Sequence, residues 1–337
     1  MPNTNPVIDN SGQIKFIKEK SEGLLVDVYP IAAVTKGQEG KELTEMGDII
    51  NAGGVAFSDD GYPVKNTAIL RRALEYVKMF GKPIIDHCED LSLSGNGVMN
   101  EGFVSTILGM KGIPPISEEI TVARDLLVAE YTKGPLHIAH VSTKGSVALI
   151  REAKAKGVNV TAEVCPHHLF LTDEAVRTFD TNTKMKPPLR TEEDRKALID
   201  GLKDGTIDVI ATDHAPHSIE EKETEYDVAP FGVIGLETAL GLVLTHLVGK
   251  GLLTLKEIVE KMSVSPKKIL GLAENRIEKG KPANLTILDI EEEWVVDKTS
   301  FRSKSHNTPF DGWTLKGKSF GVFNNGQLFL SSSPSTT

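Results

Sequence analysis

Cysteine, aromatic residues and long apolar runs are all scarce in this chain of 337 residues. Its two cysteines, Cys88 and Cys165, are too few for a disulfide framework and fit a reducing compartment. No run of about 18 apolar residues occurs, so no membrane span is predicted. The first residues, MPNTNPVIDN, lack the basic and apolar regions of a signal peptide. These absences predict a cytoplasmic protein that has no membrane partner.

Several common functional motifs are also absent. The formal net charge is -9 and the basic residues form no stripe, so nucleic acid is not expected as a partner. The chain has neither the G-x-S-x-G turn of serine hydrolases nor the G-x-x-x-x-G-K-[ST] phosphate loop. Cys88 is better explained as a small core residue than as a nucleophile. An anionic substrate stays possible, because a bound metal or an Arg can reverse the field inside a cleft.

Strand-like apolar runs alternate with helix-like segments along most of the chain. The runs lack polar alternation, as strands buried on both faces do: Leu24–Val34, Gly54–Phe57, Pro83–His87, Leu136–Val141, Val158–Val164 and Asp208–Thr212. Helices are predicted between them, capped by Asn66, by Ser117 and by Thr191 with Asp194. This alternation predicts βα units around a parallel sheet, and the length suits one α/β barrel of the TIM type.

The pattern changes from about Lys279. The segment KPANLTILDIEEEWVV predicts a strand, and GKSFGVFNNGQLFL predicts a hairpin that turns at Asn324, Asn325 and Gly326. We therefore expect a barrel over residues 1–278 and a small β appendage over residues 279–330. The Ser-rich tail, residues 331–337, is expected to fray.

Side chains that bind metals recur where the predicted strands end. They are Asp59, Asp60, Asp86, His87, Glu89, Asp90, His137, His140, Glu163, His167, His168, Asp213, His214 and His217. In a parallel barrel the strand ends meet at one face, where active sites form. Burying so many ionisable groups without a cation would cost several kcal/mol each. The pattern therefore predicts a metal site.

Four of these residues are predicted to be the ligands. We assign Asp60 as a carboxylate that bridges two ions, His87 and His140 to one ion, and Asp213 to the other. Asp59 is the alternative to Asp60, because neighbours on an extended strand point to opposite faces.

The other histidines are expected to support the site. His137 is three residues from His140, so on a strand it faces away and is expected to be structural. His167 and His168 follow Pro166 in a predicted loop, and at least one is a candidate for a residue that orients the ligands.

The motifs together resemble those of bacterial class I dihydroorotases, which belong to the amidohydrolase superfamily. They occur in order along nearly the whole chain, at Met1–Pro6, Phe57–Gly61, Asp86–Asp90, His137–Thr143, Ala162–Leu169, Lys186–Arg190, Ala211–His217, Phe231–Thr238 and Asn307–Trp313. The resemblance implies a metal-dependent barrel with a small β appendage. It also implies one or two Zn²⁺ ions, and an Asp bridge where other amidohydrolases use a carboxylated Lys.

The implied reaction is the reversible opening of dihydroorotate to N-carbamoyl-L-aspartate in pyrimidine biosynthesis. A hydroxide activated by metal attacks the ring carbonyl, and Asp213 carries the proton to the leaving nitrogen. The substrate contacts implied by the family fall on Asn3, His217 and the backbone of Phe231 and Gly232. The implied partners are a second copy of the chain and an aspartate transcarbamoylase.

Two departures from the family pattern affect this expectation. The family has an H-x-H pair on the first barrel strand, followed by an Arg that binds substrate. This sequence has no such pair and matches only strands three to eight, so we expect a further N-terminal segment in the natural protein. The family also has an Asn where this chain has Lys186, so Lys186 is a doubtful substrate contact.

Two other functions are weighed against a working dihydroorotase. A silent relative that only partners a transcarbamoylase would explain the missing H-x-H pair and Lys186. A hydantoinase or allantoinase is the other alternative, but those enzymes use a Lys bridge that the segment FSDDG does not offer.

Overall fold

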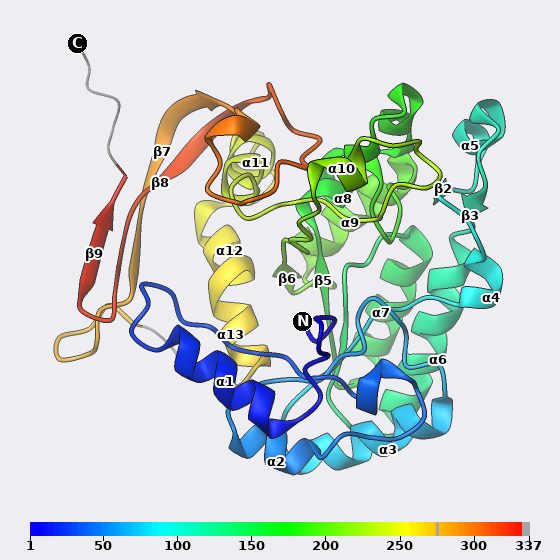
Figure 1. The fold of residues 1–337 in the computed structure, drawn as a ribbon, viewed down its shortest axis with the longest axis vertical. Coiled ribbons are helices and arrows are strands. Elements are labelled where there is room, and N and C mark those ends of the chain that lie inside the picture. The colour runs from blue at the N-terminus through cyan, green and yellow to red at the C-terminus, as the bar shows by residue number, and fades with distance from the viewer. Residues whose placement is uncertain (274–275, 332–337) are drawn as a thin grey trace.

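The computed structural model describes residues 1–273 and 276–331, and its centre is a parallel sheet (Figure 1). The predicted fraying of the tail falls almost wholly outside the described residues. The paired strands follow chain order across the sheet: β1 (Ile84–Asp86), β4 (Leu136–Ile138), β5 (Val160–Val164) and β6 (Val209–Ile210). The register sets Leu136 of β4 between Ile84 and Val160. The strand ends that carry the candidate ligands therefore lie at one edge of the sheet.

Single parallel bridges add the first two predicted strands to this sheet. Ala32 pairs with Phe57, and Phe57 pairs with Ile84. The Ser58 amide donates to the Ala32 carbonyl at 2.8 Å, and the Ile85 amide donates to the Phe57 carbonyl at 2.8 Å. The predicted parallel arrangement of strand positions in chain order is confirmed.

The predicted strand Leu24–Val34 is too long. Only the part around Ala32 joins the sheet, whereas the Leu24 and Val26 side chains are exposed. The carbonyls of Leu24 and Leu25 instead accept hydrogen bonds from the side chains of Asn325 and Asn324. An apolar run cannot show that its backbone bonds to distant side chains instead of a neighbouring strand.

Amphipathic helices cover the outside of the sheet. The apolar faces of α3 (Thr67–Val77), α6 (Ile116–Thr132), α7 (Lys144–Ala155) and α9 (Glu192–Asp204) enter one large core. The predicted caps at Asn66 and at Thr191 with Asp194 are confirmed. The predicted cap at Ser117 is wrong, because the helix begins at Ile116 and Ser117 Oγ donates back to the Pro114 carbonyl.

Shorter elements fill the connections. The α-helices are α1 (Ser11–Ser21), α2 (Met46–Asn51), α4 (Leu91–Ser94), α5 (Phe103–Leu108), α8 (Pro166–Phe170), α10 (Ile219–Lys222), α11 (Ala239–Val243), α12 (Leu255–Val259) and α13 (Ser265–Ile269). The 3-10 turns are η1 (Lys36–Gln38), η2 (Lys78–Phe80), η3 (Asp173–Thr178), η4 (Thr181–Thr183) and η7 (Lys298–Ser300). The π-helical segments are η5 (Leu244–Val248) and η6 (Glu260–Val264). Within the described residues, no helix combines the length and the apolar character needed to cross a membrane.

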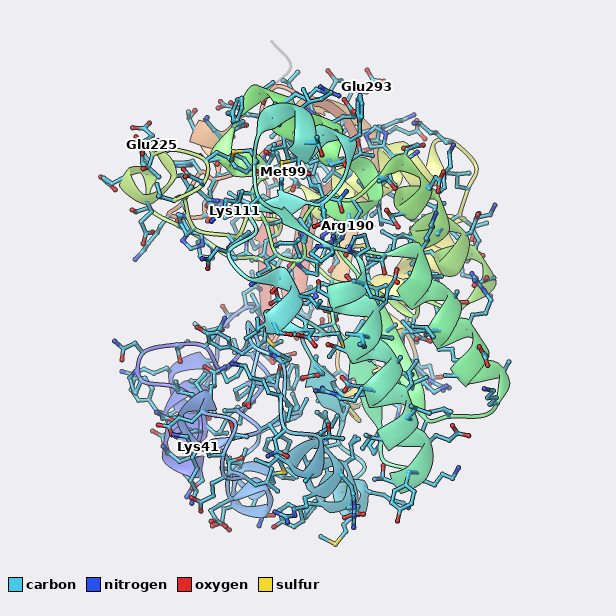
Figure 2. The ribbon with its side chains drawn as sticks, turned by 90° about the vertical axis from the view of Figure 1, so that its right-hand side faces the viewer. Lys41, Met99, Lys111, Arg190, Glu225 and Glu293 are labelled. Atoms are coloured by element: carbon cyan, nitrogen blue, oxygen red, sulfur yellow. The ribbon has the colours of Figure 1, made fainter. Side chains whose placement is uncertain are left out.

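A small pair of strands sits above the strand ends. β2 (Met99–Asn100) pairs with β3 (Gly112–Ile113) in parallel. Arg190 is buried beneath them and donates to Asn100 Oδ1 at 2.9 Å and to the Ile113 carbonyl at 2.7 Å. Figure 2 shows Arg190 beside the segment that carries Met99 and Lys111.

The C-terminal part is an antiparallel sheet that stands beside the barrel (Figure 1). It contains β7 (Leu285–Val295), β8 (Thr314–Asn324) and β9 (Gln327–Leu330). The predicted hairpin is confirmed, because Asn325 and Gly326 between β8 and β9 both have positive φ, as a two-residue hairpin turn requires. The predicted domain boundary between residues 278 and 279 stays a prediction.

Candidate metal centre

Asp60, His87 and His140 converge at the ends of three neighbouring strands. Each offers one ligand atom, and these atoms lie within 4.8 Å of one another. His87 Nδ1 is 2.9 Å from His140 Nε2, and Asp60 Oδ1 lies 3.5 Å from the first and 3.4 Å from the second. All three side chains are buried. Two imidazole nitrogens and a carboxylate oxygen form a donor set that suits Zn²⁺.

The charges of the cluster favour a cation between these side chains. Burial acts to lower the pKa of His87, but the carboxylates of Asp60 and Glu89 raise it to about 9. Burial acts to raise the pKa of Asp60, but the two imidazoles hold it well below its usual range. The ionised carboxylate thus stabilises positive charge at the point where the imidazoles meet. A divalent cation would take the place of the imidazole protons there.

Asp213 lies beside this cluster, after the end of β6. Burial raises the pKa of its carboxyl group, the charge of His140 lowers it, and the charges of Asp60 and Glu163 raise it further. Asp213 and His140 both have positive φ, at 45° and 31°. Such conformations are rare for residues other than Gly and cluster at functional sites. The structure thus brings Asp213 near the cluster but outside the set of atoms within 4.8 Å.

Asp59 and His137 point elsewhere. The Asp59 carboxylate accepts from the Thr35 amide at 3.0 Å and from Thr35 Oγ1 at 2.6 Å. The His137 ring bonds Thr161 Oγ1 at 2.7 Å and Glu163 Oε2 at 3.0 Å. Both side chains therefore hold neighbouring segments of the barrel together.

Three further candidates make hydrogen bonds that stabilise the fold. Asp86 accepts from the Val64 amide at 2.9 Å, and Asp90 caps α4. His214 Nδ1 accepts from the Gly235 amide at 3.1 Å. None of these residues belongs to the cluster of Asp60.

His167 and His168 do not lie in a loop, as we expected. They occupy the middle of the short helix α8, and both are buried. The helix forms because Pro166 fixes a helical φ at its first position. Sequence reasoning placed Pro166 as a loop residue because five helical residues give no periodic signal.

Glu89 links Lys186 to the cluster of Asp60. Its Nζ lies 2.9 Å from Glu89 Oε1, and Glu89 Oε2 lies 3.3 Å from His87 Nε2. The Lys186 ammonium also sits 5.4 Å from the centre of the Phe231 ring. Glu89 thus orients His87 from the side opposite the cluster, as outer carboxylates do for metal-binding histidines.

The predicted substrate contacts lie in two places. His217 Nε2 donates to the Phe231 carbonyl at 2.8 Å, and Asn307 Nδ2 donates to the Gly232 carbonyl at 3.1 Å. Asn3 is exposed, in an N-terminal segment that approaches the cluster. The α-amino group of Met1 lies near the cluster. Burial lowers the pKa of this group, and the charges of Asp60 and Asp213 raise it.

Two lysines that sequence reasoning missed hold the loop of Phe231 and Gly232. Lys222 Nζ donates to the Pro230 carbonyl at 2.8 Å, and Lys184 Nζ donates to the Tyr226 carbonyl at 2.8 Å. The Gly232 amide in turn donates to the Lys184 carbonyl at 2.9 Å. Burial lowers the pKa of both lysines to about 8. No feature of the sequence distinguishes them from surface lysines.

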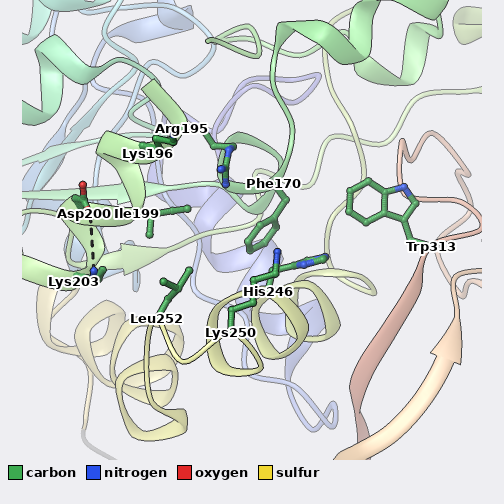
Figure 3. A pocket seen from close by; sticks show the side chains of 10 residues that line it. All are labelled: Phe170, Arg195, Lys196, Ile199, Asp200, Lys203, His246, Lys250, Leu252 and Trp313. Carbon is green, nitrogen blue, oxygen red and sulfur yellow. Dashed lines mark ion pairs between the residues drawn. The ribbon is translucent and has the colours of Figure 1, made fainter. Parts of the chain in front are cut away.

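A separate pocket of about 520 Å³ lies between α9 and the segment that follows α11 (Figure 3). Phe170, Arg195, His246 and Trp313 are among the residues that line it, and none of the lining residues belongs to the cluster. Phe170 is the last residue of α8, so this helix has the pocket at one end and the buried histidines within it.

Comparison with known proteins identifies the family. Residues 1–146 match the family model described as dihydro-orotase-like. The chain is 54% identical to the dihydroorotase of Acetivibrio thermocellus over 98% of this chain and 78% of that protein. It is 56% identical to the dihydroorotase of Pelotomaculum thermopropionicum over 98% of this chain and 77% of that protein. The chain belongs to the dihydroorotase family.

Solved structures confirm the predicted barrel for this member of the dihydroorotase family. The L-hydantoinase (dihydropyrimidinase) from Arthrobacter aurescens matches with a TM-score of 0.87 and 26% identity, over 99% of this chain and 76% of that one. The dihydropyrimidinase from Brevibacillus agri NCHU1002 matches with a TM-score of 0.80 and 21% identity, over 95% of this chain and 73% of that one. The fold is therefore shared between the dihydroorotase and hydantoinase families.

Proposed function

We propose that this chain acts as a dihydroorotase, which interconverts dihydroorotate and N-carbamoyl-L-aspartate in cytoplasmic pyrimidine biosynthesis. The convergence of Asp60, His87 and His140, with Asp213 beside them, is the observation that carries the proposal. Relatives named dihydroorotase at 54% and 56% identity support this substrate over those of the hydantoinases, which share the fold at lower identity.

The donor set fits a Zn²⁺ ion. His140 Nε2 lies 2.9 Å from His87 Nδ1 and 3.4 Å from Asp60 Oδ1, so this nitrogen faces the point that the three side chains share. When bound, the ion would acidify a water and polarise the ring carbonyl. We propose one or two such ions, with Asp60 as the residue that would bridge a pair.

Asp213 is the proposed proton carrier. In ring opening, the oxygen of water forms a bond to the carbonyl carbon, and the amide C–N bond breaks. Asp213 takes the proton of the water and gives it to the departing nitrogen. A carboxyl group whose pKa is raised by burial holds a proton more readily than an exposed one, which suits this exchange.

The loop of Phe231 and Gly232 is the proposed binding surface for the ring. Asn307 and Lys184 fix the backbone of Gly232 from opposite sides, so its polar groups hold one orientation. His217 donates to the Phe231 carbonyl in the structure, so its proposed contact with the substrate carboxylate requires this bond to be exchanged. Asn3 is the proposed contact from the N-terminal segment.

Substrate comparison tests the proposal directly. Purified protein loaded with Zn²⁺ should open dihydroorotate and close N-carbamoyl-L-aspartate, and should leave hydantoin and allantoin unchanged. Turnover of hydantoin or allantoin in preference to dihydroorotate would contradict the proposed substrate and support a cyclic amidase of the hydantoinase kind.

A second candidate is a catalytically silent subunit that partners an aspartate transcarbamoylase. Lys186 favours this candidate, because it pairs with Glu89 at a position where the family has an amide that binds substrate. Co-purification with a transcarbamoylase, less than half an equivalent of Zn²⁺ and no ring opening would together support this function. Assembly as a homodimer is compatible with either candidate and is proposed on the resemblance alone.

A further inference from the structure

A second group of metal-ligating side chains lies where β5 ends. Cys165, His167 and His168 each offer one ligand atom, and these atoms lie within 4.8 Å of one another. All three side chains are buried, with exposed fractions of 0%, 2% and 3%. The turn from β5 into α8 brings them together, because Cys165 precedes the helix and both histidines lie within it. The two imidazole rings are 4.4 Å apart between centres.

The hydrogen bond of His168 fixes which of its nitrogens is free. His168 Nε2 lies 2.9 Å from the Pro187 carbonyl, which can only accept, so Nε2 carries the proton. The lone pair is therefore on Nδ1, which is buried and has no hydrogen-bond partner. Metal-binding histidines commonly donate their second nitrogen to a backbone carbonyl in this way.

His167 presents a second buried atom without a partner. Its Nε2 has no hydrogen bond, so two unpartnered imidazole nitrogens occur in neighbouring residues of one short helix. An unpartnered buried polar group destabilises the folded state, and folded proteins seldom keep two together without a ligand or a water. These are the nitrogens that the two histidines have free for a ligand.

Burial keeps the two imidazoles in the protonation state that a metal requires. It lowers the pKa of His167 well below its usual value and that of His168 to about 3, so both rings are neutral and have a lone pair. Burial raises the pKa of the Cys165 thiol, and the charge of Asp213 raises it further, so the thiol keeps its proton until a metal displaces it. A cation at this position would meet a site with negative charge nearby.

We propose that Cys165, His167 and His168 form a second metal site, which binds Zn²⁺ through one thiolate and two imidazoles. Binding breaks the S–H bond of Cys165, forms a bond from sulfur to the metal, and releases the proton to water. Sulfur and imidazole donors select Zn²⁺ over Mg²⁺ or Ca²⁺. This site shares no ligand with the cluster of Asp60 and does not depend on the proposed activity.

The spacing of the three ligand atoms is close to that of a tetrahedral site. Zn–S and Zn–N bonds of about 2.3 and 2.0 Å place tetrahedral ligand atoms roughly 3.3–3.6 Å apart. The three atoms, now within 4.8 Å, need to approach by little more than about an ångström. Three protein ligands leave the fourth position for water, as in zinc sites that are not fully closed.

The other cysteine provides a matched control. Cys88 is also buried and lies near two carboxylates, Asp86 and Asp125. The Arg124 guanidinium already pairs with Asp125 at 2.6 Å and with Asp86 at 3.4 Å, so a cation is present there without a metal. We therefore expect Cys88 to contribute no metal ligand.

Titration of the metal-free chain with Co²⁺ tests the site, because a thiolate bound to Co²⁺ gives a charge-transfer absorption in the near ultraviolet. We expect this band in the unaltered chain, in Cys88→Ser and in Asp60→Ala, and its loss in Cys165→Ser. His167→Gln should keep the fold and weaken Co²⁺ binding at least tenfold. Circular dichroism of each variant checks that it folds.

Two outcomes would overturn the site. One is the absence of the band from the unaltered chain, and the other is a band that survives in Cys165→Ser or disappears in Cys88→Ser. A chain that shows the band but does not open dihydroorotate would leave this site in place and count against the proposed function alone.

Discussion

The Lys186 ammonium lies 2.9 Å from Glu89 Oε1, and the other oxygen of the same carboxylate lies 3.3 Å from His87 Nε2. Lys186 is therefore paired with a protein carboxylate, and the same carboxylate contacts His87 of the cluster. The resemblance implied an Asn that binds substrate at this position, and the structure shows how a Lys can occupy it without leaving a buried charge unpaired.

Glu89→Gln should weaken Zn²⁺ binding at the cluster of Asp60 by about 10- to 100-fold. Glu89 stabilises the His87 tautomer that presents Nδ1 to His140 and Asp60. An amide can bond the same nitrogen but carries no charge. Competition with a chelator measures the affinity, and Asp90→Asn, at the neighbouring cap of α4, is the matched control. Equal affinities in both variants would remove the orienting role of Glu89.

Lys186→Asn should lower the KM for dihydroorotate several-fold. The amide supplies both a donor and an acceptor, which an ammonium cannot. Lys186→Met is the matched control, because it also breaks the pair with Glu89 but offers no polar group. Steady-state kinetics on the three proteins separates the effects. If both variants raise KM, Lys186 itself serves the substrate, and the idea of a lost amide contact is wrong.

Much of the site could be predicted from the sequence, because the local pattern of residues shows where strands end. Asp60, His87 and His140 each lie at or just after the end of a predicted strand, and parallel pairing alone brings them to one edge. The helix cap at Asn66 and the turn at Gly326 were likewise local and were predicted correctly.

The features that the sequence did not reveal depend on contacts between distant segments. Lys184 and Lys222 are buried because carbonyl groups from remote loops surround their ammonium groups. The pairing of Lys186 with Glu89 joins segments almost a hundred residues apart. No local pattern carries such information, and the short helix at Pro166 is below the length at which periodicity can be seen.

Lys222→Met should change how stability depends on pH. The pKa of Lys222 is lowered to about 8 in the folded chain, against about 10.4 in an unfolded one. Between these values the folded chain has released a proton that the unfolded chain keeps, so stability rises with pH over this range. Lys222→Met should remove part of this rise in stability. The remainder should persist, because the pKa of Lys184 is also lowered in the folded chain.

Urea unfolding at pH 8, 9 and 10 measures this effect. Lys250→Met, at an exposed lysine, should leave the pH dependence as it is in the unaltered chain. A rise of the same size in Lys222→Met would mean that Lys222 is not neutral in the folded chain at high pH.

Gly232→Ala should raise the KM for dihydroorotate while Gly157→Ala leaves it unchanged. Both glycines have positive φ, at 128° and 77°, so each substitution strains the backbone, by about 1–3 kcal/mol. Only at Gly232 would the new Cβ meet neighbours, at 2.7 Å from Ala215 Cβ and 3.0 Å from His217 Nε2. His217 would then leave the Phe231 carbonyl. Equal KM values for the two variants would show that this loop does not bind substrate.

Asp213→Asn should reduce the kcat for ring opening by about 10²- to 10⁴-fold, which is the usual contribution of a general acid or base. The fold should persist, because Asn tolerates the positive φ of this position better than most residues. Thermal unfolding should therefore shift little, and binding of Zn²⁺ through Asp60, His87 and His140 should remain measurable. Asp311→Asn, at an exposed site, is the control for the substitution itself. A variant that keeps near-normal kcat would exclude Asp213 as the proton carrier. A variant that loses metal together with activity would show that Asp213 acts as the metal ligand predicted from the sequence.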